Sequence, residues 1–202
     1  MRILLFGGFL GSGKTSTILQ AARQITEIRK ETVVIIENEV GEAGVDDQLL
    51  AGSALQVRPL FGGCVCCQIT SDLVTAVAEI TDNYHPDWLI IEMTGLAVPG
   101  NVAKLVRQYD ASRSPCKTVS IVDAGRWQEL KEVLEPLILA QIKESDLVMI
   151  NKIDLADLDK EIDLGQIEAD VRQIAGPAAT CLTVSAAKPL PLAVLEEVFH
   201  LE

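Results

Sequence analysis

The sequence predicts an α/β fold in which a mostly parallel sheet carries helices on both faces. Short apolar, often β-branched runs alternate with longer segments whose apolar residues recur every three or four positions. Such alternation is typical of strand–helix–strand units with parallel strands. A glycine-rich loop also joins the first apolar run to the first helical segment, an arrangement typical of phosphate-binding folds.

Seven apolar runs are expected to form the strands. They are Ile3–Phe6, Thr32–Ile36, Val57–Leu60, Trp88–Ile91, Thr118–Val122, Leu147–Ile150 and Cys181–Val184. Proline cannot donate to a strand ladder, so Pro59 restricts the third run to a short strand or an edge strand.

Helices are expected between these strands. Lys14–Lys30 carries apolar residues at Ile18, Ala22, Ile25 and Ile28, which form one helical stripe. The other helical segments are Leu73–Ile80, Asn101–Tyr109, Trp127–Ile142, Leu164–Ile174 and Leu190–His200. The acidic stretch 157–163 is interpreted as a solvated helix start, because carboxylates are favourable near a helix N-terminus.

Size and composition indicate a single globular domain over residues 1–202. Hydrophobic residues make up 49% of the chain, enough for a packed core. A net charge of −12 repels phosphate backbones. Aromatic residues make up only 4% of the chain, so few side chains can stack on bases, and no nucleic-acid partner is expected. No apolar run approaches the roughly 18 residues of a membrane helix. With no export signal recognised, we expect a cytoplasmic protein without a membrane partner.

Residues 8–15 read G-F-L-G-S-G-K-T and match the phosphate-loop pattern G-x-x-x-x-G-K-[ST]. The glycines let successive backbone N–H groups approach phosphate oxygens. Lys14 is expected to neutralise the β- and γ-phosphates, and the Thr15 hydroxyl to hold Mg²⁺. The expected phosphate contacts are Gly8, Gly11, Ser12, Gly13, Lys14, Thr15 and Ser16.

Guanine recognition is predicted from N-K-I-D at residues 151–154, directly after a late strand. Asp154 can accept hydrogen bonds from guanine N1–H and the 2-amino group, whereas adenine offers neither donor there. The stem of Lys152 is expected to pack along the base. Ser185 and Ala186, after the last strand, resemble a loop that closes on guanine. The predicted base-binding residues are therefore Asn151, Lys152, Asp154, Ser185 and Ala186.

Glu92 and Gly95 follow the strand Trp88–Ile91, where common GTPases carry D-x-x-G. The acid there faces Mg²⁺ and the glycine N–H faces the γ-phosphate, so both residues join Lys14 and Thr15 as candidate catalytic residues. The phosphate loop, Glu37, Glu92, Asp123, Asn151 and Ser185 all follow carboxyl ends of predicted parallel strands. Ligands of open α/β sheets bind at that edge.

A second cluster combines the acidic stretch 37–42 with three thiols at Cys64, Cys66 and Cys67. Thiolates with carboxylates suit Zn²⁺, or less readily Co²⁺ or Ni²⁺. Redox chemistry is the next interpretation, and simple packing the last. Cys116 and Cys181, both near strands, are expected to be buried side chains.

These motifs together resemble the CobW-like GTPases, a metal- and cobalamin-associated branch of the phosphate-loop NTPases. The resemblance rests on residues 8–15, 36–42, 63–67, 91–99 and 151–154, and it extends over nearly the whole chain. The branch carries glutamate where common GTPases have aspartate, and Glu92 matches it. It implies a P-loop NTPase fold, a GTP/GDP cycle with Mg²⁺, and a client metalloenzyme or corrinoid protein. A nucleotide-dependent homodimer is a further expected partner arrangement.

The resemblance also implies that Glu37, Glu42, Cys66 and Cys67 ligate the transition metal, with Cys64 close by. Residues 37–67 would then form a nucleotide-sensitive switch. Two departures stand out: Gly62 replaces the usual asparagine before G-C-x-C-C, and the C-terminal domain of most relatives is absent from these 202 residues. The chain is therefore expected to be a truncated protein or a stand-alone GTP-binding domain.

The predicted function is a slow Mg²⁺-dependent GTPase that loads or releases a transition metal. One alternative is a corrinoid-enzyme activator or cobalamin-pathway chaperone, in which metal binding is secondary. Another is a thiol redox sensor built on a GTP-binding scaffold. An ATP-dependent small-molecule kinase is disfavoured by the N-K-I-D motif.

Overall fold

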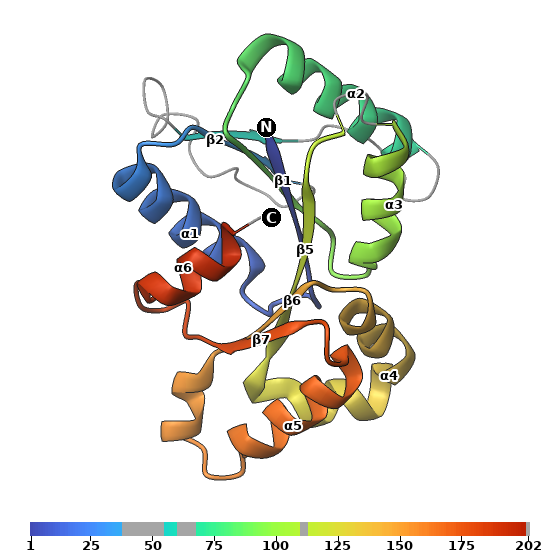
Figure 1. Cartoon of the computed structure of the whole chain (residues 1–202). Helices are drawn as coiled ribbons and strands as arrows, with labels where there is room; N and C mark the ends of the chain where they lie inside the picture. Colours follow the sequence, from blue (N-terminus) through green and yellow to red (C-terminus); the bar gives the residue numbers. More distant parts are fainter. Residues whose placement is uncertain (38–54, 60–67, 110–112, 201–202) are drawn as a thin grey trace.

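A single parallel sheet forms the centre of the molecule in the computed structural model, which describes residues 1–37, 55–59, 68–109 and 113–200 (Figure 1). Its strands are β1 (Arg2–Gly7), β2 (Val33–Glu37), β3 (Leu55–Pro59), β4 (Trp88–Glu92), β5 (Cys116–Asp123), β6 (Leu147–Asn151) and β7 (Thr180–Thr183). Their order is β3-β2-β4-β1-β5-β6-β7, and each neighbouring pair is parallel. The predicted α/β class is confirmed.

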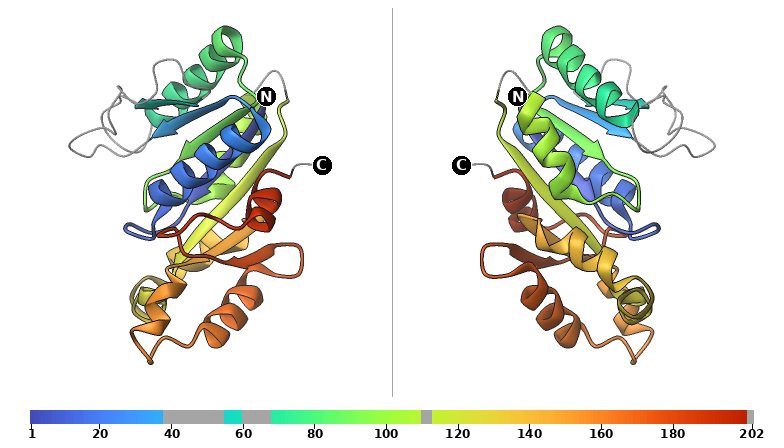
Figure 2. Two further views of the ribbon diagram at one scale, coloured as in Figure 1. Left: turned by 90° about the vertical axis from the view of Figure 1, so that its left-hand side faces the viewer. Right: turned by 90° about the vertical axis from the view of Figure 1, so that its right-hand side faces the viewer.

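Helices cover both faces of this sheet, as predicted (Figure 2). They are α1 (Lys14–Arg29), α2 (Gln68–Tyr84), α3 (Pro99–Tyr109), α4 (Trp127–Lys143), α5 (Leu164–Ala175) and α6 (Leu192–Val198), with short 3₁₀ turns η2 (Ala124–Arg126) and η3 (Ile153–Asp157). The acidic stretch behaves as expected at its end, where the Asp163 carboxylate accepts from Gln166 N–H and caps α5. In the described part of the chain, no helix is long and apolar enough to cross a membrane.

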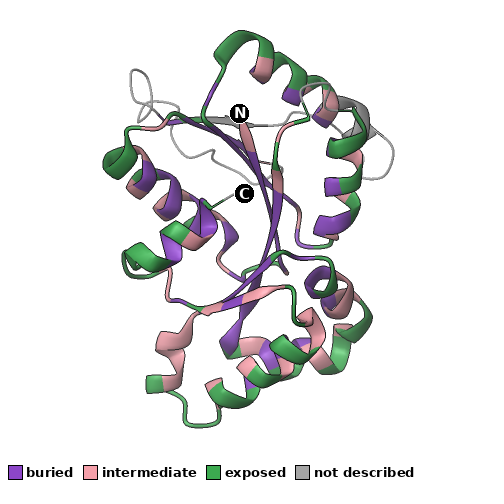
Figure 3. Cartoon of the chain, in the orientation of Figure 1, coloured by how far each residue is buried: buried purple, intermediate pink, exposed green. Residues whose placement is uncertain are grey.

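Strand side chains alternate between two cores, because successive residues of a strand point to opposite faces. Leu4 and Phe6 of β1 pack with α1 and α6, whereas Ile3 and Leu5 pack with α2 and α3. A third cluster places α4 and α5 on the same face as α2 and α3, over β5, β6 and β7. Burial is therefore almost continuous along the central strands (Figure 3).

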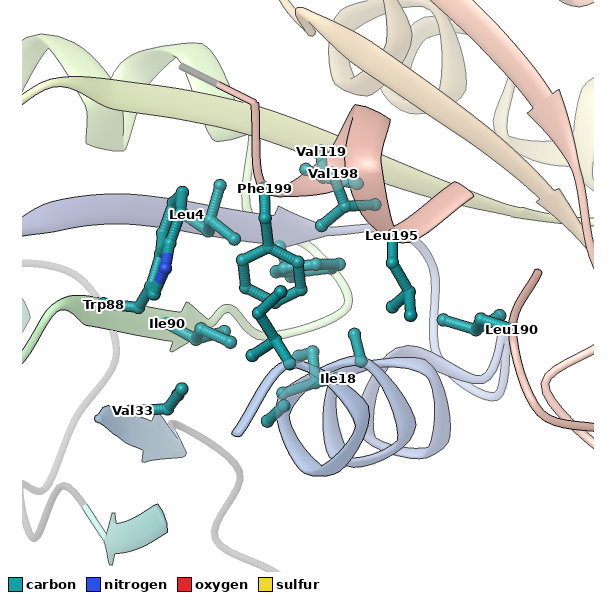
Figure 4. Packing of buried hydrophobic residues seen from close by; sticks show 14 of the residues in the cluster. Leu4, Ile18, Val33, Trp88, Ile90, Val119, Leu190, Leu195, Val198 and Phe199 are labelled. Carbon is teal, nitrogen blue, oxygen red and sulfur yellow. The ribbon is translucent and has the colours of Figure 1, made fainter. Parts of the chain in front are cut away.

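One aromatic contact and one buried cation hold α6 and the residues after it against the sheet. Phe199 meets the Trp88 ring edge-to-face, with centroids 4.8 Å apart and planes at 80° (Figure 4). Lys117 is buried, and its Nζ donates to the carbonyls of Glu197 at 2.6 Å and His200 at 3.3 Å. A cation at these terminal carbonyls complements the helix dipole.

The predicted position of Pro59 is confirmed. β3 is an edge strand of the sheet and ends at this proline. It begins at Leu55 rather than Val57.

Strand register brings the predicted site segments to one edge of the sheet. Glu92 pairs with Phe6 of β1 and with Glu37 of β2, and Asp123 pairs with Asn151 across β5 and β6. The strand order reverses around β1, whose neighbours are β4 and β5. Such a switch point opens a crevice at the carboxyl ends of the strands.

Candidate nucleotide and metal site

The loop between β1 and α1 has the conformation that its glycines permit. Gly8, Gly11 and Gly13 have φ values of 136°, 77° and 91°. A Cβ on Gly8 would clash with the Ile121 carbonyl oxygen, and one on Gly13 would clash with Asn151 Nδ2. The loop therefore requires glycine at both positions for conformational and steric reasons.

Ser12 lies inside this loop and has an unusual polar environment. Its side chain is 1% exposed, and among the described residues its Oγ is the buried side-chain oxygen without a hydrogen-bond partner. A buried hydroxyl is normally paired with protein, water or a ligand. An orphaned donor in a glycine-built cradle fits a loop that receives an anionic ligand.

Lys14 and Thr15 begin α1 directly after the cradle. Lys14 is 4% exposed, and its Nζ lies 3.4 Å from the Phe9 carbonyl oxygen of the same loop. The Thr15 hydroxyl donates to Glu92 Oε1 at 2.7 Å, although the two residues are 77 positions apart. Glu92 is itself 2% exposed. This pair of hard oxygen atoms beside the phosphate loop is the type of donor set that Mg²⁺ prefers.

Gly95 follows β4 in a turn that lies against the phosphate loop. The backbone N–H of Ala97 donates to the Thr94 carbonyl at 3.0 Å and closes the turn. A Cβ on Gly95 would lie 2.7 Å from the backbone nitrogen of Leu10. The predicted catalytic residues Lys14, Thr15, Glu92 and Gly95 thus lie in two segments that meet at the loop.

Asn151 connects three segments of the site. Its Nδ2 donates to the Ser12 carbonyl at 2.9 Å, and its Oδ1 accepts from the Ala186 N–H at 2.9 Å. From α1, Gln20 Nε2 donates to the Ala186 carbonyl at 2.8 Å. The phosphate loop, the end of β6 and the loop after β7 are therefore held in one arrangement.

An open cavity of about 270 Å³ lies beside these contacts. Its lining consists of Gly13, Ser16, Asn151, Lys152, Asp154, Leu155, Ala186 and Ala187. Asp154 Oδ1 accepts a 2.5 Å hydrogen bond from the Ser185 hydroxyl. This bond, assisted by the Lys188 and Lys152 ammonium groups, lowers the pKa of Asp154 below its usual range. The carboxylate is therefore ionised at neutral pH, as acceptance of two guanine N–H groups requires.

Lys152 is held by a partner that the sequence did not reveal. Its Nζ forms a 2.8 Å ion pair with Asp123 Oδ2, and the other oxygen of Asp123 accepts from Gly125 N–H at 3.0 Å. Asp123 is 2% exposed, so its charge requires this pairing. Lys152 has a φ of 63°, and the ion pair fixes its side chain at the wall of the cavity.

The predicted transition-metal ligands are only partly described. Glu37 ends β2 and pairs in register with Glu92, so it lies on the phosphate edge. Glu42, Cys64, Cys66 and Cys67 lie outside the described residues. Within the described ranges, no group of three His, Cys, Asp or Glu side chains is arranged to hold a metal ion. Cys181 is buried, as predicted, and burial raises the pKa of its thiol. Cys116 is only half-buried, contrary to the prediction, because it is the first residue of β5.

Comparison with known families agrees with this geometry. Residues 2–181 match the family described as "CobW/HypB/UreG, nucleotide-binding domain". The chain belongs to the CobW/HypB/UreG family. The resemblance to CobW-like GTPases inferred from the motifs is thereby confirmed.

Curated relatives in the CobW/HypB/UreG family carry names that mention zinc. Zinc chaperone YjiA of Escherichia coli is 30% identical over 165 residues, covering 76% of this chain and 50% of YjiA. The zinc-regulated GTPase metalloprotein activator 1 of Schizosaccharomyces pombe is 30% identical over 164 residues, covering 76% of this chain and 39% of the activator. The chain thus spans about half the length, or less, of such relatives.

Solved structures of the CobW/HypB/UreG family share the fold. HypB from Helicobacter pylori in complex with nickel superposes with a TM-score of 0.68 at 18% identity, over 98% of this chain and 83% of HypB. Zn(II)-bound YjiA GTPase from E. coli gives a TM-score of 0.65 at 23% identity, over 100% of this chain and 63% of YjiA. At these identities the likeness establishes the P-loop NTPase architecture.

Proposed function

We propose that this chain is a Mg²⁺-dependent GTP-binding domain that hydrolyses GTP and couples the nucleotide state to binding of a transition metal, foremost Zn²⁺. The contact between Thr15 Oγ1 and Glu92 Oε1 carries the proposal, because it joins the phosphate loop to the acid that marks this branch of GTPases. The names of the relatives support zinc over the corrinoid alternative.

The described residues offer a contact for each part of a guanine nucleotide. Guanine would occupy the cavity at Asp154, and the phosphates would lie along the 8–15 loop. The orphaned Ser12 hydroxyl and the Thr15–Glu92 oxygen pair fit a Mg²⁺–phosphate group. When bound, Mg²⁺ would be held by Thr15 and Glu92 and would neutralise charge on the β- and γ-phosphate oxygens.

Hydrolysis requires few covalent events from the protein. Water attacks the γ-phosphorus, the bond to the bridging oxygen breaks, and GDP and inorganic phosphate leave. Lys14 would stabilise charge on the phosphate oxygens, and the N–H of Gly95 would donate to the γ-phosphate. Slow turnover is expected, because the described residues contribute positioning and charge rather than a dedicated base.

The first prediction is selectivity for GTP over ATP. Adenine presents no pair of N–H donors to Asp154, so the carboxylate loses contact with water without gaining hydrogen bonds from the base, and ATP should bind at least about a hundredfold more weakly. Isothermal titration with GDP, ADP and the non-hydrolysable analogues of GTP and ATP measures the ratio. Equal competition by ATP would refute the guanine assignment.

The second prediction concerns the metal. The chain should bind about one Co²⁺ or Zn²⁺ through thiolates, and Co²⁺ should give a charge-transfer band with intense visible bands. The variant Cys66→Ser/Cys67→Ser should lose these bands, whereas Cys116→Ser/Cys181→Ser, equal in number of thiols removed, should keep them. Retention of the full spectrum by the first variant would contradict the metal site.

The same titration tests coupling between metal and nucleotide. Metal affinity should differ about 5- to 150-fold between the GDP and GTP-analogue complexes, because allosteric couplings usually fall in that range. Bound metal must then change the GTP/GDP affinity ratio by the same factor. Loss of thiols to mild oxidant in the absence of metal, with no such coupling, would favour the redox-sensor alternative.

A client metalloenzyme and a nucleotide-dependent homodimer belong to the same proposal. The names of relatives such as the metalloprotein activator of S. pombe support a client that contains metal. We further propose that these residues form one GTP-binding domain acting in the cytoplasm. Fractionation and size-exclusion chromatography with GDP and GTP analogue test both expectations.

A further inference from the structure

A buried glutamine on α4 contacts the turn that contains Gly95. Gln141 is 2% exposed, and its Nε2 donates to the carbonyl oxygens of Gly95 and Ala97, each at 3.0 Å. A primary amide has two N–H donors, so both are used on a single four-residue turn. Gln141 is 44 to 46 positions away from these partners in the sequence.

The backbone of Gln141 is anchored as firmly as its side chain. Its carbonyl oxygen accepts from Ser120 Oγ at 2.7 Å and lies 2.8 Å from Ser145 Oγ. The two hydroxyl oxygens are 2.7 Å apart. Ser120 is on β5 and Ser145 follows α4, so this buried network connects the sheet, the end of α4 and the turn. Fully paired buried networks fix one local arrangement, because any unpaired member costs free energy.

The turn lies where a γ-phosphate is expected and away from the base. It begins two residues after Glu92, which contacts Thr15, and it packs against the backbone of Leu10 in the phosphate loop. The base cavity at Asp154 includes neither the turn nor Gln141 in its lining. A change in the turn should therefore affect GTP, which has the γ-phosphate, more than GDP.

We propose that Gln141 is a positioning residue for GTP hydrolysis. Its hydrogen bonds to the carbonyls of Gly95 and Ala97 hold the 94–97 turn so that the Gly95 N–H is in place for the γ-phosphate before GTP binds. Without this clamp, GTP must order the turn itself, and part of its binding energy is lost to that ordering. The inference rests on the proposed GTPase function of the site.

The Gln141→Leu variant tests the clamp, because leucine has a similar volume and no donors. Hydrogen exchange of the amides at 94–97 should become at least about tenfold faster in the nucleotide-free protein. GTP turnover and GTP-analogue affinity should fall roughly ten- to a hundredfold, since two hydrogen bonds are lost, while GDP affinity changes by less than about twofold. Gln141→Glu, which keeps the shape but loses the donors when ionised, should act in the same direction.

Lys117→Met is the matched control for loss of stability. It removes a buried polar side chain that touches α6 and neither the turn nor the cavity. Its Tm should fall while the GTP-analogue/GDP affinity ratio stays at the wild-type value. The proposal is overturned if the Gln141 variants weaken GDP and GTP analogue equally, or if exchange at 94–97 is unchanged.

Failure of the proposed function gives a different result. If wild-type protein binds no guanine nucleotide, the GTPase proposal is wrong, whatever the variants do. Faster exchange at 94–97 in Gln141→Leu would still show that the clamp holds the turn, but its assignment to GTP hydrolysis would be overturned. If the wild-type protein hydrolyses GTP and both Gln141 variants hydrolyse it equally fast, the role of Gln141 is refuted while the proposed GTPase function stands.

Discussion

The Lys14→Ala variant is expected to lose GTP turnover and to bind GTP at least about a hundredfold more weakly than wild type. Lys14 is 4% exposed at the start of α1, and its ammonium group already lies at the phosphate loop. Charge-assisted hydrogen bonds contribute roughly 1.5–3 kcal/mol each, and this side chain would make several to phosphate oxygens. Phosphate release and titration with a fluorescent GTP analogue measure the two effects.

Lys104→Ala is the control for this substitution. Lys104 forms an exposed ion pair with Glu144 at 2.9 Å on the face that α3 and α4 share. Exposed pairs contribute about 0–1 kcal/mol, so nucleotide binding and turnover should stay at the wild-type level. If Lys14→Ala hydrolyses GTP as fast as Lys104→Ala, the phosphate-binding role assigned to the loop is wrong.

Much of the fold follows from local pattern in the sequence. Buried parallel strands are apolar on both faces, so runs such as Leu147–Ile150 stand out without knowledge of their neighbours. Because all these strands run the same way, residues that follow them must meet at one edge, and Glu92 and Thr15 do so at 2.7 Å. The start of β3 is predicted two residues too late, at Val57 instead of Leu55, although Gly52 and Ser53 before it are typical strand-boundary residues.

The supporting contacts of the site could not be derived in the same way. Gln141 belongs to no motif; its only signal is a polar residue beside the apolar Ile138 and Ile142 of an amphipathic helix. Asp123 was placed on the correct edge, but its pairing with Lys152 depends on the positions of η2 and η3. Such contacts join residues 29 to 46 positions apart, and only the packed tertiary structure determines them.

Asn151 has a structural role that its motif does not predict. The N-K-I-D pattern predicted a residue at the guanine base, whereas the observed contacts of Asn151 are with Ser12 and Ala186. It holds the phosphate loop and the last loop together, and the Gly13 backbone approaches it too closely for any Cβ. The motif therefore specifies the shape of the cavity as well as its chemistry, while contacts of these residues with a nucleotide stay predictions.

Asp154→Asn is expected to change which base the cavity prefers. Guanine needs two acceptors at this position, and the amide of asparagine replaces one of them with a donor. GTP affinity should therefore fall at least about a hundredfold. Xanthine carries an oxygen in place of the guanine 2-amino group and can accept from that amide. The variant should therefore bind xanthosine triphosphate more tightly than GTP, the reverse of wild type.

The contacts of Asp154 make this substitution informative. Ser185 donates to its carboxylate at 2.5 Å and can donate equally to the amide oxygen of asparagine, which favours an orientation with the amide nitrogen toward the base. Asp157→Asn removes a nearby charge on the exposed side of η3, outside the cavity lining, and should leave base preference unchanged. The Ser185 bond also lowers the pKa of Asp154, so this carboxylate should keep accepting from guanine as pH falls into the usual range of aspartate titration. An Asp154→Asn protein that still prefers GTP would show that other residues recognise guanine.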